Sequence, residues 1–402
     1  MSKQTTTYLS MKKLFFLLFG LYLSYPVFSQ TTYYYPPGYF GLYNNQSTSA
    51  RAQGMGFTTL TRAGIENSFY NPAAIGSSKT PIQAYANYAN GHSYRPNSRY
   101  YFVGGAVRLK EKISVGLSYF SYQNPDPVWT TIIGGGTFDT DFFSQRAISI
   151  LAAYELMEGL QVGLSANMMQ ENAVNGEKTN SDFIPSLGAQ YQKGVNFFKS
   201  EKIRNQQFFG ALSLSNFLFN GETNQEYQDW MSISYLPIIL RLGTGYSFQL
   251  PLSSGLTSGK AYFREGAQAV DLRLDLQFQD YLPGGPENNT DHELSTAFGV
   301  GAEAWFFERL AFRIGYFTEK GPSGIQSDGD IWVTGNRAGF SWGYGTLIPT
   351  YQLTDGKMPF DIEVNLVTGK QITSLNEEIY THPAIFADDT FQFAFGLNLL
   401  WR

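Results

Sequence analysis

Few residues in this 402-residue sequence have the types and spacing that covalent chemistry needs. Residues 339–343 are Gly-Phe-Ser-Trp-Gly, the Gly-x-Ser-x-Gly pattern in which hydrolases hold a serine nucleophile on a strand-to-helix turn. Here the pattern lies inside an alternating, strand-like segment, so we expect Ser341 to be non-catalytic and the glycines to leave room for a neighbouring segment. The three histidines, His92, His292 and His382, lack metal-ligand spacing, and cysteine is absent. We therefore predict no catalytic residues, no metal site and no cofactor.

A set of charged residues is a stronger candidate for a functional site. Each lies in a segment where polar and apolar residues alternate, and successive strand residues point to opposite faces, so all of them face the same side. They are Arg241, Asp271, Arg273, Asp275, Glu303, Arg313, Asp361 and Glu363. We favour a structural role, because charges inside a fold must be paired. The alternative is a functional role: gating, a polar path, or an arginine that binds the carboxylate of a ligand.

Composition limits the class of protein that carries these residues. Charged residues are only 15%, aromatic residues reach 16% and glycine numbers 41, which argues against both disorder and an ordinary soluble enzyme. The mean hydropathy is −0.22, which is too polar for a bundle of membrane helices. The net charge of −5 gives no support for nucleic-acid binding.

Strand-like alternation recurs from Ile82 to the end of the chain. Residues 270–279, for example, place Val, Leu, Leu, Leu and Phe on one face and Asp, Arg, Asp, Gln and Gln on the other. The segments exceed the ~5–6 residues usual in globular sheets and match the length of tilted membrane strands. About fourteen can be counted by the alternation rule, near 82–94, 99–109, 113–123, 143–155, 159–171, 182–192, 207–217, 235–249, 268–280, 295–306, 309–318, 336–346, 358–368 and 389–401.

Short turns, such as residues 110–112 and 307–308, alternate with long loops along these segments. The sequence therefore predicts an all-β fold, a closed antiparallel transmembrane β-barrel of about fourteen strands. Aromatic residues at strand ends, among them Tyr100 and Tyr122, are expected to form girdles at the membrane interfaces, with a ligand groove as the alternative.

The N-terminal residues predict export. Lys12 and Lys13 precede an apolar stretch that is followed by the small residue Ser29, so we expect residues 1–29 to be a signal peptide. Residues 30–81 lack sustained alternation and form a separate N-terminal region, and residues 82–402 form the barrel. An even number of strands then places both termini in the periplasm and the protein in the cell outer membrane.

Three stretches of the sequence carry a family resemblance. The first is residues 50–56 (ARAQGMG) with residues 70–73 (YNPA). The others are residues 236–243 (LPIILRLG), and residues 300–303 (VGAE) with residues 310–316 (LAFRIGY). They resemble the FadL-type superfamily of outer-membrane β-barrels, including the PorV-like branch found in type IX secretion.

The resemblance implies that residues 30–81 fold into the barrel lumen as a plug, or hatch. The hatch motif residues would be Gly54, Met55, Gly56, Asn71, Pro72 and Ala73. In the FadL branch it implies passive transport of hydrophobic small molecules, such as long-chain fatty acids, across the outer membrane, and this is the predicted function.

The PorV-like branch implies a different role, as a partner in protein secretion or surface assembly without small-molecule transport, and this alternative stays open. A structural barrel with a closed lumen is a third interpretation. The expected partners are outer-membrane lipid, a hydrophobic ligand or secretion-system proteins, and no nucleic acid.

Overall fold

The structure is a computed structural model that describes most of the chain between Thr48 and Trp401. The described residues are 48–78, 80–92, 95–124, 128–132, 136–140, 143–172, 178–200, 202–215, 217, 238–251, 269–282, 296–320, 323–325, 331–333, 336–374 and 389–401. The expected signal peptide, residues 1–29, lies outside them, as does the start of the expected hatch region up to residue 47. Within the described part of the chain, no helix has the length and apolar character needed to cross a membrane.

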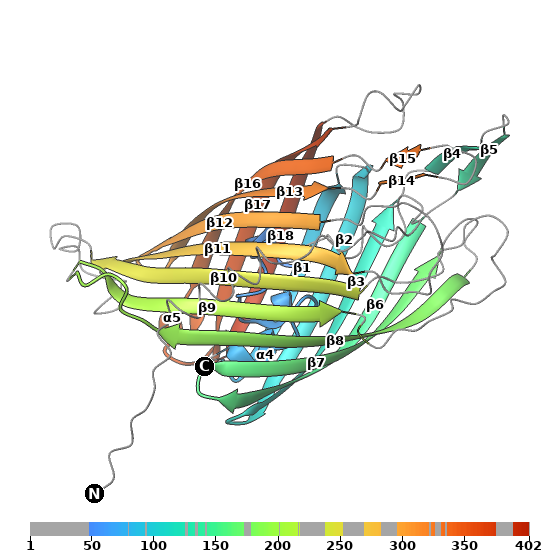
Figure 1. Cartoon of the computed structure of the whole chain (residues 1–402). Coiled ribbons are helices and arrows are strands. Elements are labelled where there is room, and N and C mark those ends of the chain that lie inside the picture. The colour runs from blue at the N-terminus through green and yellow to red at the C-terminus, as the bar shows by residue number, and fades with distance from the viewer. Residues whose placement is uncertain are drawn as a thin grey trace, which may run out of the picture.

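Fourteen antiparallel strands form one closed barrel (Figure 1). The first strand, β1, pairs with the last, β18, so that no edge is left open. Closure satisfies the backbone N–H and C=O groups of the strands, which lipid cannot do. The barrel strands are β1 (Ile82–His92), β2 (Arg95–Lys110), β3 (Ile113–Asn124), β6 (Phe143–Met157), β7 (Leu160–Asn172), β8 (Lys178–Gly194), β9 (Arg204–Ser215), β10 (Ile238–Pro251), β11 (Ala269–Leu282), β12 (Thr296–Phe306), β13 (Leu310–Lys320), β16 (Asn336–Ile348), β17 (Phe360–Ser374) and β18 (Asp389–Trp401). The predicted fold class and strand number are confirmed.

The alternation of residue types decides which face of the wall each side chain occupies. On β11, Leu274 and Leu276 are exposed on the outer face, whereas Asp275 between them is buried in the lumen. The same holds on β6, where Ile150 is 62% exposed and Leu151 is buried. An apolar outer face is what a barrel presents to lipid.

The connections differ between the two ends of the barrel. We call the end where β1 begins and β18 ends the short-turn end. Residues 111–112, 158–159 and 307–309 are tight connections at this end, whereas residues 195–203 and residues 349–359, with α5 (Thr350–Leu353), are longer. At the opposite end the structure adds two small hairpins that the sequence analysis did not predict. They are β4–β5 (Val128–Ile132 and Gly136–Thr140) and β14–β15 (Ser323–Ile325 and Ile331–Val333).

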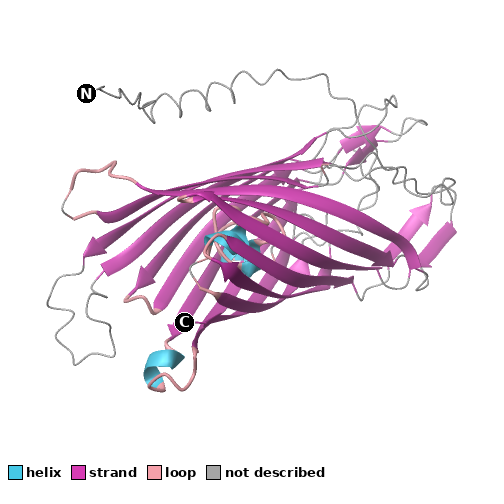
Figure 2. Ribbon diagram, turned by 90° about the horizontal axis from the view of Figure 1, so that it is seen from below, coloured by secondary structure: helices cyan, strands magenta, loops and turns pink. Residues whose placement is uncertain are grey.

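The segment from Thr48 to Ser78 lies inside the barrel and is called the hatch from here on (Figure 2). It contains α3 (Ala50–Gln53), the 3-10 helix η1 (Ile65–Asn67) and α4 (Ala74–Ser77). Each helix is a single turn, so most backbone groups of the hatch need partners outside their own helix. The hatch crosses the lumen, because α3 lies against β17 and β18 while α4 lies against β6 and β7.

An apolar core fills the space between the hatch and the wall formed by β1, β2 and β3. Phe69 of the hatch stacks on Phe120 of β3, with ring centroids 5.6 Å apart. Tyr100 and Tyr122 lie 5.3 Å apart and are 1% and 0% exposed. The expected interfacial position of these two tyrosines is therefore wrong. Strand parity, and not nearness to a strand end, decides the face, and it places both rings in the lumen with Phe120.

Candidate functional site

The first hatch motif, residues 54–56, lies against glycines of the barrel wall. Gly56 has a φ of 64°, in the left-handed region that glycine adopts without strain. Its N–H donates to Ser341 Oγ at 3.3 Å. A Cβ at Gly315 would overlap the Gly56 nitrogen, and a Cβ at Gly301 would lie 2.6 Å from Met55 Cβ. Glycines in β12 and β13 therefore let the hatch backbone reach the wall.

The second hatch motif, residues 71–73, lies against β7 and β8 in the same way. Asn71 is fully buried, and its Oδ1 accepts a hydrogen bond from the Ala73 N–H at 3.1 Å. A Cβ at Gly163 would overlap the backbone of Pro72 and Ala73, and a Cβ at Gly188 would overlap Asn71 Oδ1. The two motifs thus hold the hatch against two separate parts of the wall.

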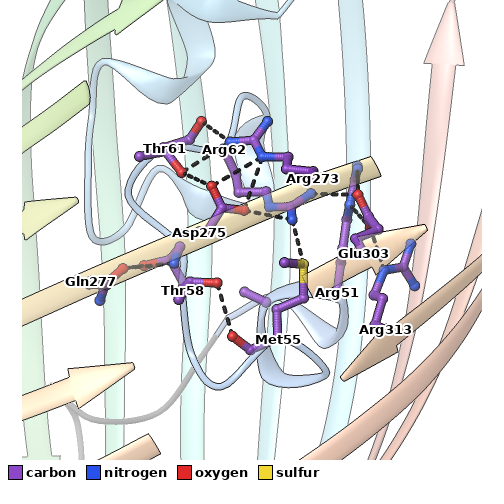
Figure 3. Close-up of polar contacts among 12 residues, drawn as sticks. Arg51, Met55, Thr58, Thr61, Arg62, Arg273, Asp275, Gln277, Glu303 and Arg313 are labelled. Atoms are coloured by element: carbon purple, nitrogen blue, oxygen red, sulfur yellow. Dashed lines mark hydrogen bonds and ion pairs between the residues drawn. The ribbon is translucent and has the colours of Figure 1, made fainter. Parts of the chain in front are cut away.

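Glu303 on β12 is the centre of an ion-pair network that joins the hatch to the wall (Figure 3). From the hatch, Arg51 donates to its two carboxylate oxygens at 2.8 and 2.6 Å, and Arg62 donates at 2.8 Å. From β13, Arg313 donates at 2.5 Å. One buried carboxylate therefore accepts hydrogen bonds from three guanidinium groups, and such charge-assisted bonds are roughly twice as strong as neutral ones.

Asp275 on β11 joins the same network through different partners. Its Oδ2 lies 2.8 Å from Arg62 Nη2 and 3.0 Å from Arg273 Nε. Its Oδ1 accepts from the Thr61 hydroxyl at 2.6 Å, and Arg273 Nη2 donates to the Thr61 carbonyl oxygen at 2.7 Å. Arg62 of the hatch thus bridges Asp275 and Glu303, which lie on neighbouring strands.

Glu363 on β17 completes the network at longer range. It lies 3.8 Å from Arg51 Nη1 and 3.7 Å from Arg313 Nη2. Both guanidinium groups also lie over the ring of Trp305, at 5.6 and 5.5 Å from its centroid. In the described part of the lumen, four guanidinium groups thus face three carboxylates in this hatch–wall network. Each buried ion loses several kcal/mol of hydration free energy, and ion pairs with several partners offset this loss.

A further carboxylate, Glu66 in η1, is buried beside the network. It is 4% exposed, and its Oε2 has no hydrogen-bond partner among the described residues. Burial and, next, repulsion by Glu363 raise the pKa of Glu66 to about 7. Since the hatch lies within the lumen and does not itself cross the membrane, this carboxyl group changes charge near neutral pH inside the plug.

Amide side chains of the wall make uncharged contacts with the hatch backbone. Gln277 Oε1 on β11 accepts from the backbone N–H groups of Thr59 at 2.7 Å and Leu60 at 3.1 Å. Gln83 Oε1 on β1 accepts from the Ile65 N–H at 3.1 Å. These bonds satisfy backbone donors of the hatch that regular secondary structure leaves unpaired.

The structure brings together five of the eight charged residues that alternation predicts to share one face. They are Arg273, Asp275, Glu303, Arg313 and Glu363. The other three lie apart from the network. Arg241 donates to Gln279 Oε1 at 2.6 Å and lies over the Tyr70 ring at 4.9 Å. Asp361 accepts from a backbone N–H of α5 at 3.2 Å, and Asp271 is half-buried nearer the short-turn end.

The hatch side of the network was not among the predicted site residues. Arg51, Arg62 and Thr61 form this side of the network. The two arginines could have been predicted from the numbers of acidic and basic residues. The predicted inward-facing set has five acids and three arginines, and residues 30–81 contain two arginines. A segment placed in that lumen would therefore supply the missing positive charges.

Ser341 is placed for packing. It lies in the middle of β16, so the strand-to-helix turn of a nucleophile elbow is absent at this position. Its neighbours Phe340 and Trp342 point outward and are 57% and 40% exposed. Among the described residues, no group of three or more His, Asp or Glu side chains is arranged to hold a metal ion.

A closed fourteen-stranded barrel with an apolar outer face and an N-terminal segment inside its lumen is a plugged β-barrel of the outer-membrane type. No protein-family model matches the sequence, and no curated protein matches it significantly. Solved structures of similar fold include the following three. CymD, a monoaromatic hydrocarbon channel, is 10% identical with a TM-score of 0.45, over 88% of this chain and 96% of its own.

The Pseudomonas putida toluene transporter TodX is 8% identical with a TM-score of 0.44, over 92% of this chain and 99% of its own. A FadL homologue from Pseudomonas aeruginosa is 10% identical with a TM-score of 0.47, over 89% of this chain and 98% of its own. These likenesses are of fold alone.

Proposed function

We propose that this protein lets hydrophobic small molecules cross the outer membrane passively, through a lumen that the hatch closes and opens. In this proposal a signal peptide directs export, the short-turn end faces the periplasm, and the chain carries out no covalent chemistry. Long-chain fatty acids belong to this substrate class, as do the aromatic hydrocarbons for which CymD and TodX are named. The hatch–wall network acts as the gate.

The observation that carries the proposal is the aromatic lining of the lumen beside the hatch. Phe102 on β2 and Phe120 on β3 face inward, at 1% and 2% exposed. Phe102 lies 6.1 Å from the ring of Tyr85 on β1, and Phe120 stacks on Phe69 of the hatch. Water-filled porins have polar interiors, so an aromatic wall suits apolar compounds instead. Movement of the hatch would uncover these rings as a surface for such compounds.

Ion pairs suit a plug that has to move. Water reaches the network at two places, because the side chains of Arg51 and Arg273 are 24% and 16% exposed. Charges that separate into water regain hydration, which offsets much of the lost attraction. A hatch held by such pairs opens at lower free-energy cost than one held by the same area of apolar contact.

A disulfide between hatch and wall tests whether the hatch must move. A Cβ at Gly76 in α4 would lie 3.1 Å from Ala153 Cβ on β6, near the roughly 3.5–4.5 Å of disulfides. The chain has no cysteine, so G76C/A153C contains a single pair. The test is to express the full chain carrying this pair in a Gram-negative host that lacks its own FadL-type transporter. The quantities to measure are the uptake of a fluorescent long-chain fatty acid and of radiolabelled toluene. Oxidised cells should lose most of the uptake, and a reductant should restore it.

The single variants G76C and A153C are the matched controls, and neither should respond to oxidant. Equal uptake by the oxidised and reduced double variant would show that the hatch stays in place during transport. Wild-type cells that take up neither probe faster than vector-only cells would refute transport itself. Stoichiometric co-purification of the full chain with secretion-system proteins would then support the PorV-like alternative.

A further inference from the structure

The loop between β8 and β9 lies at the short-turn end, and the structure describes its residues 195–200, 202 and 203. The Val195 N–H donates to the Gln206 carbonyl oxygen at 2.9 Å. The Gln206 side chain, buried at 5% exposed, accepts from the Phe198 N–H at 3.0 Å and donates to the Phe198 carbonyl oxygen at 2.7 Å. A buried glutamine therefore joins the loop to the first residues of β9.

The loop exposes two adjacent aromatic rings. Phe197 and Phe198 are 52% and 55% exposed, and their ring centroids lie 5.8 and 6.1 Å from that of Tyr246 on β10. Tyr246 pairs with Leu274, which is on the outer face of β11, and Tyr246 Oη donates to Gln206 Oε1 at 2.6 Å. The two rings thus extend the lipid-facing apolar surface of the wall past the end of the strands.

Positive charges surround the aromatic pair. Lys193, Lys199, Lys202 and Arg204 are exposed, and Glu201 is the one acid between residues 193 and 204. This local excess occurs in a chain whose net charge is −5. Exposed rings at the acyl boundary with lysines beside them fit the surface of a bilayer that contains anionic lipid.

We propose that the β8–β9 loop binds the anionic headgroups of phospholipids in the leaflet at the short-turn end. Phe197 and Phe198 insert between the upper parts of the acyl chains, and Lys199 and Lys202 contact the lipid phosphates. Continuity with the lipid-facing wall and charge complementarity both favour a lipid partner over a protein. The proposal goes beyond transport, since it requires only that the barrel is in a bilayer whose leaflet at this end contains phospholipid.

Insertion of the loop is tested with a single label. The chain has no cysteine, so Phe198→Cys places one environment-sensitive fluorophore on the full-length protein. In nanodiscs that contain phosphatidylglycerol, the emission should shift to the blue, and lipids with spin labels near the headgroup should quench it. Emission equal to that of the label in water, as expected for a surface that binds a protein, would overturn the proposal.

Headgroup selectivity is tested by counting bound lipids. Protein taken from mixed nanodiscs into mild detergent should retain phosphatidylglycerol over phosphatidylcholine. K199Q/K202Q should lower that preference by about fivefold for each lysine removed. K357Q removes an exposed lysine from residues 349–359, a second long connection at this end that the structure describes, and should leave the preference unchanged. No preference in the wild type, or equal preference in K199Q/K202Q, would overturn the headgroup assignment. Heat-modifiable gel migration checks that each variant is folded.

Discussion

Glu303 shows how much of the contact between hatch and wall depends on single side chains. Its carboxylate is shared by Arg51, Arg62 and Arg313, and its side chain is only 1% exposed. Three positive charges gathered at one point repel each other unless the negative charge stands between them. The residue is therefore needed to keep two hatch arginines inside the barrel.

Glu303→Gln should destabilise the folded protein by about 3–5 kcal/mol, because the amide leaves buried guanidinium charges without their shared carboxylate. The free energy of unfolding in urea, measured on protein in lipid vesicles, checks this. Asp271→Asn is the matched control on the neighbouring strand, since Asp271 is half-buried and is outside the network. A loss for Glu303→Gln no larger than that of the control would contradict the central role of Glu303.

Glu66 should make the hatch pH-sensitive. Its pKa is raised from 4.5 to about 7, mainly by burial and then by Glu363, while Arg51 and Arg62 act in the opposite direction. The folded state holds this proton more tightly than the unfolded state. The contribution of Glu66 to stability is therefore greatest below pH 4.5 and falls by about 1.4 kcal/mol per pH unit until the pH reaches the raised pKa, above which it levels off.

Hydrogen exchange of the hatch amides, corrected for the intrinsic rate at each pH, measures this effect. Protection in the wild type should decline between pH 5 and pH 7, whereas Glu66→Gln, which cannot ionise, should show a nearly flat profile. The same decline in both proteins would assign the pH dependence to another group.

At the scale of elements, glycines in the wall decide where the hatch can lie. Gly301 and Gly315 on β12 and β13 face residues 54–56, and Gly163 and Gly188 on β7 and β8 face residues 71–73. Strand interiors normally disfavour glycine, so a glycine at such a position often marks a close approach of another backbone. Both hatch motifs therefore lie where the wall has no side chain between its backbone and the hatch.

Gly315→Ala should loosen the hatch while the barrel stays closed. The added Cβ overlaps the Gly56 nitrogen, and overpacking of this kind costs about 1–3 kcal/mol. Limited proteolysis should then cut the hatch faster than in the wild type, with heat-modifiable gel migration unchanged. Gly210→Ala on β9 is the control, since the nearest atom to its Cβ would be 3.7 Å away. Equal cutting rates in both variants would show that the wall tolerates a side chain at Gly315.

At the scale of the whole molecule, the lumen has two different sides. Aromatic side chains of β1, β2 and β3 contact one side of the hatch, while the charges of β11, β12, β13 and β17 contact the other. The outer face is apolar on both sides. Movement of the hatch away from β1, β2 and β3 would therefore uncover the aromatic side of the lumen, as the proposed function requires.

The sequence by itself determined the strands of the barrel, their number and the face that each strand residue occupies. Alternation is a local property, so Leu274 and Asp275 could be assigned to opposite faces from their neighbours alone. Few charges and many aromatic residues follow from the same pattern, because half of every strand meets lipid. The error at Tyr100 and Tyr122 arose where position along the strand was used in place of parity.

Only the tertiary structure decided which of the inward-facing charges meet. Arg51 and Glu303 are separated by 252 residues, and no local pattern distinguishes Glu303 from Asp361, which faces inward but contacts α5 instead. The hairpins β4–β5 and β14–β15 could likewise not be predicted from local alternation, because their strands are short and lie within long loops. Closure of the barrel sets the distance from each strand to the hatch. The network is therefore a property of the closed ring, and the individual strands contain only its components.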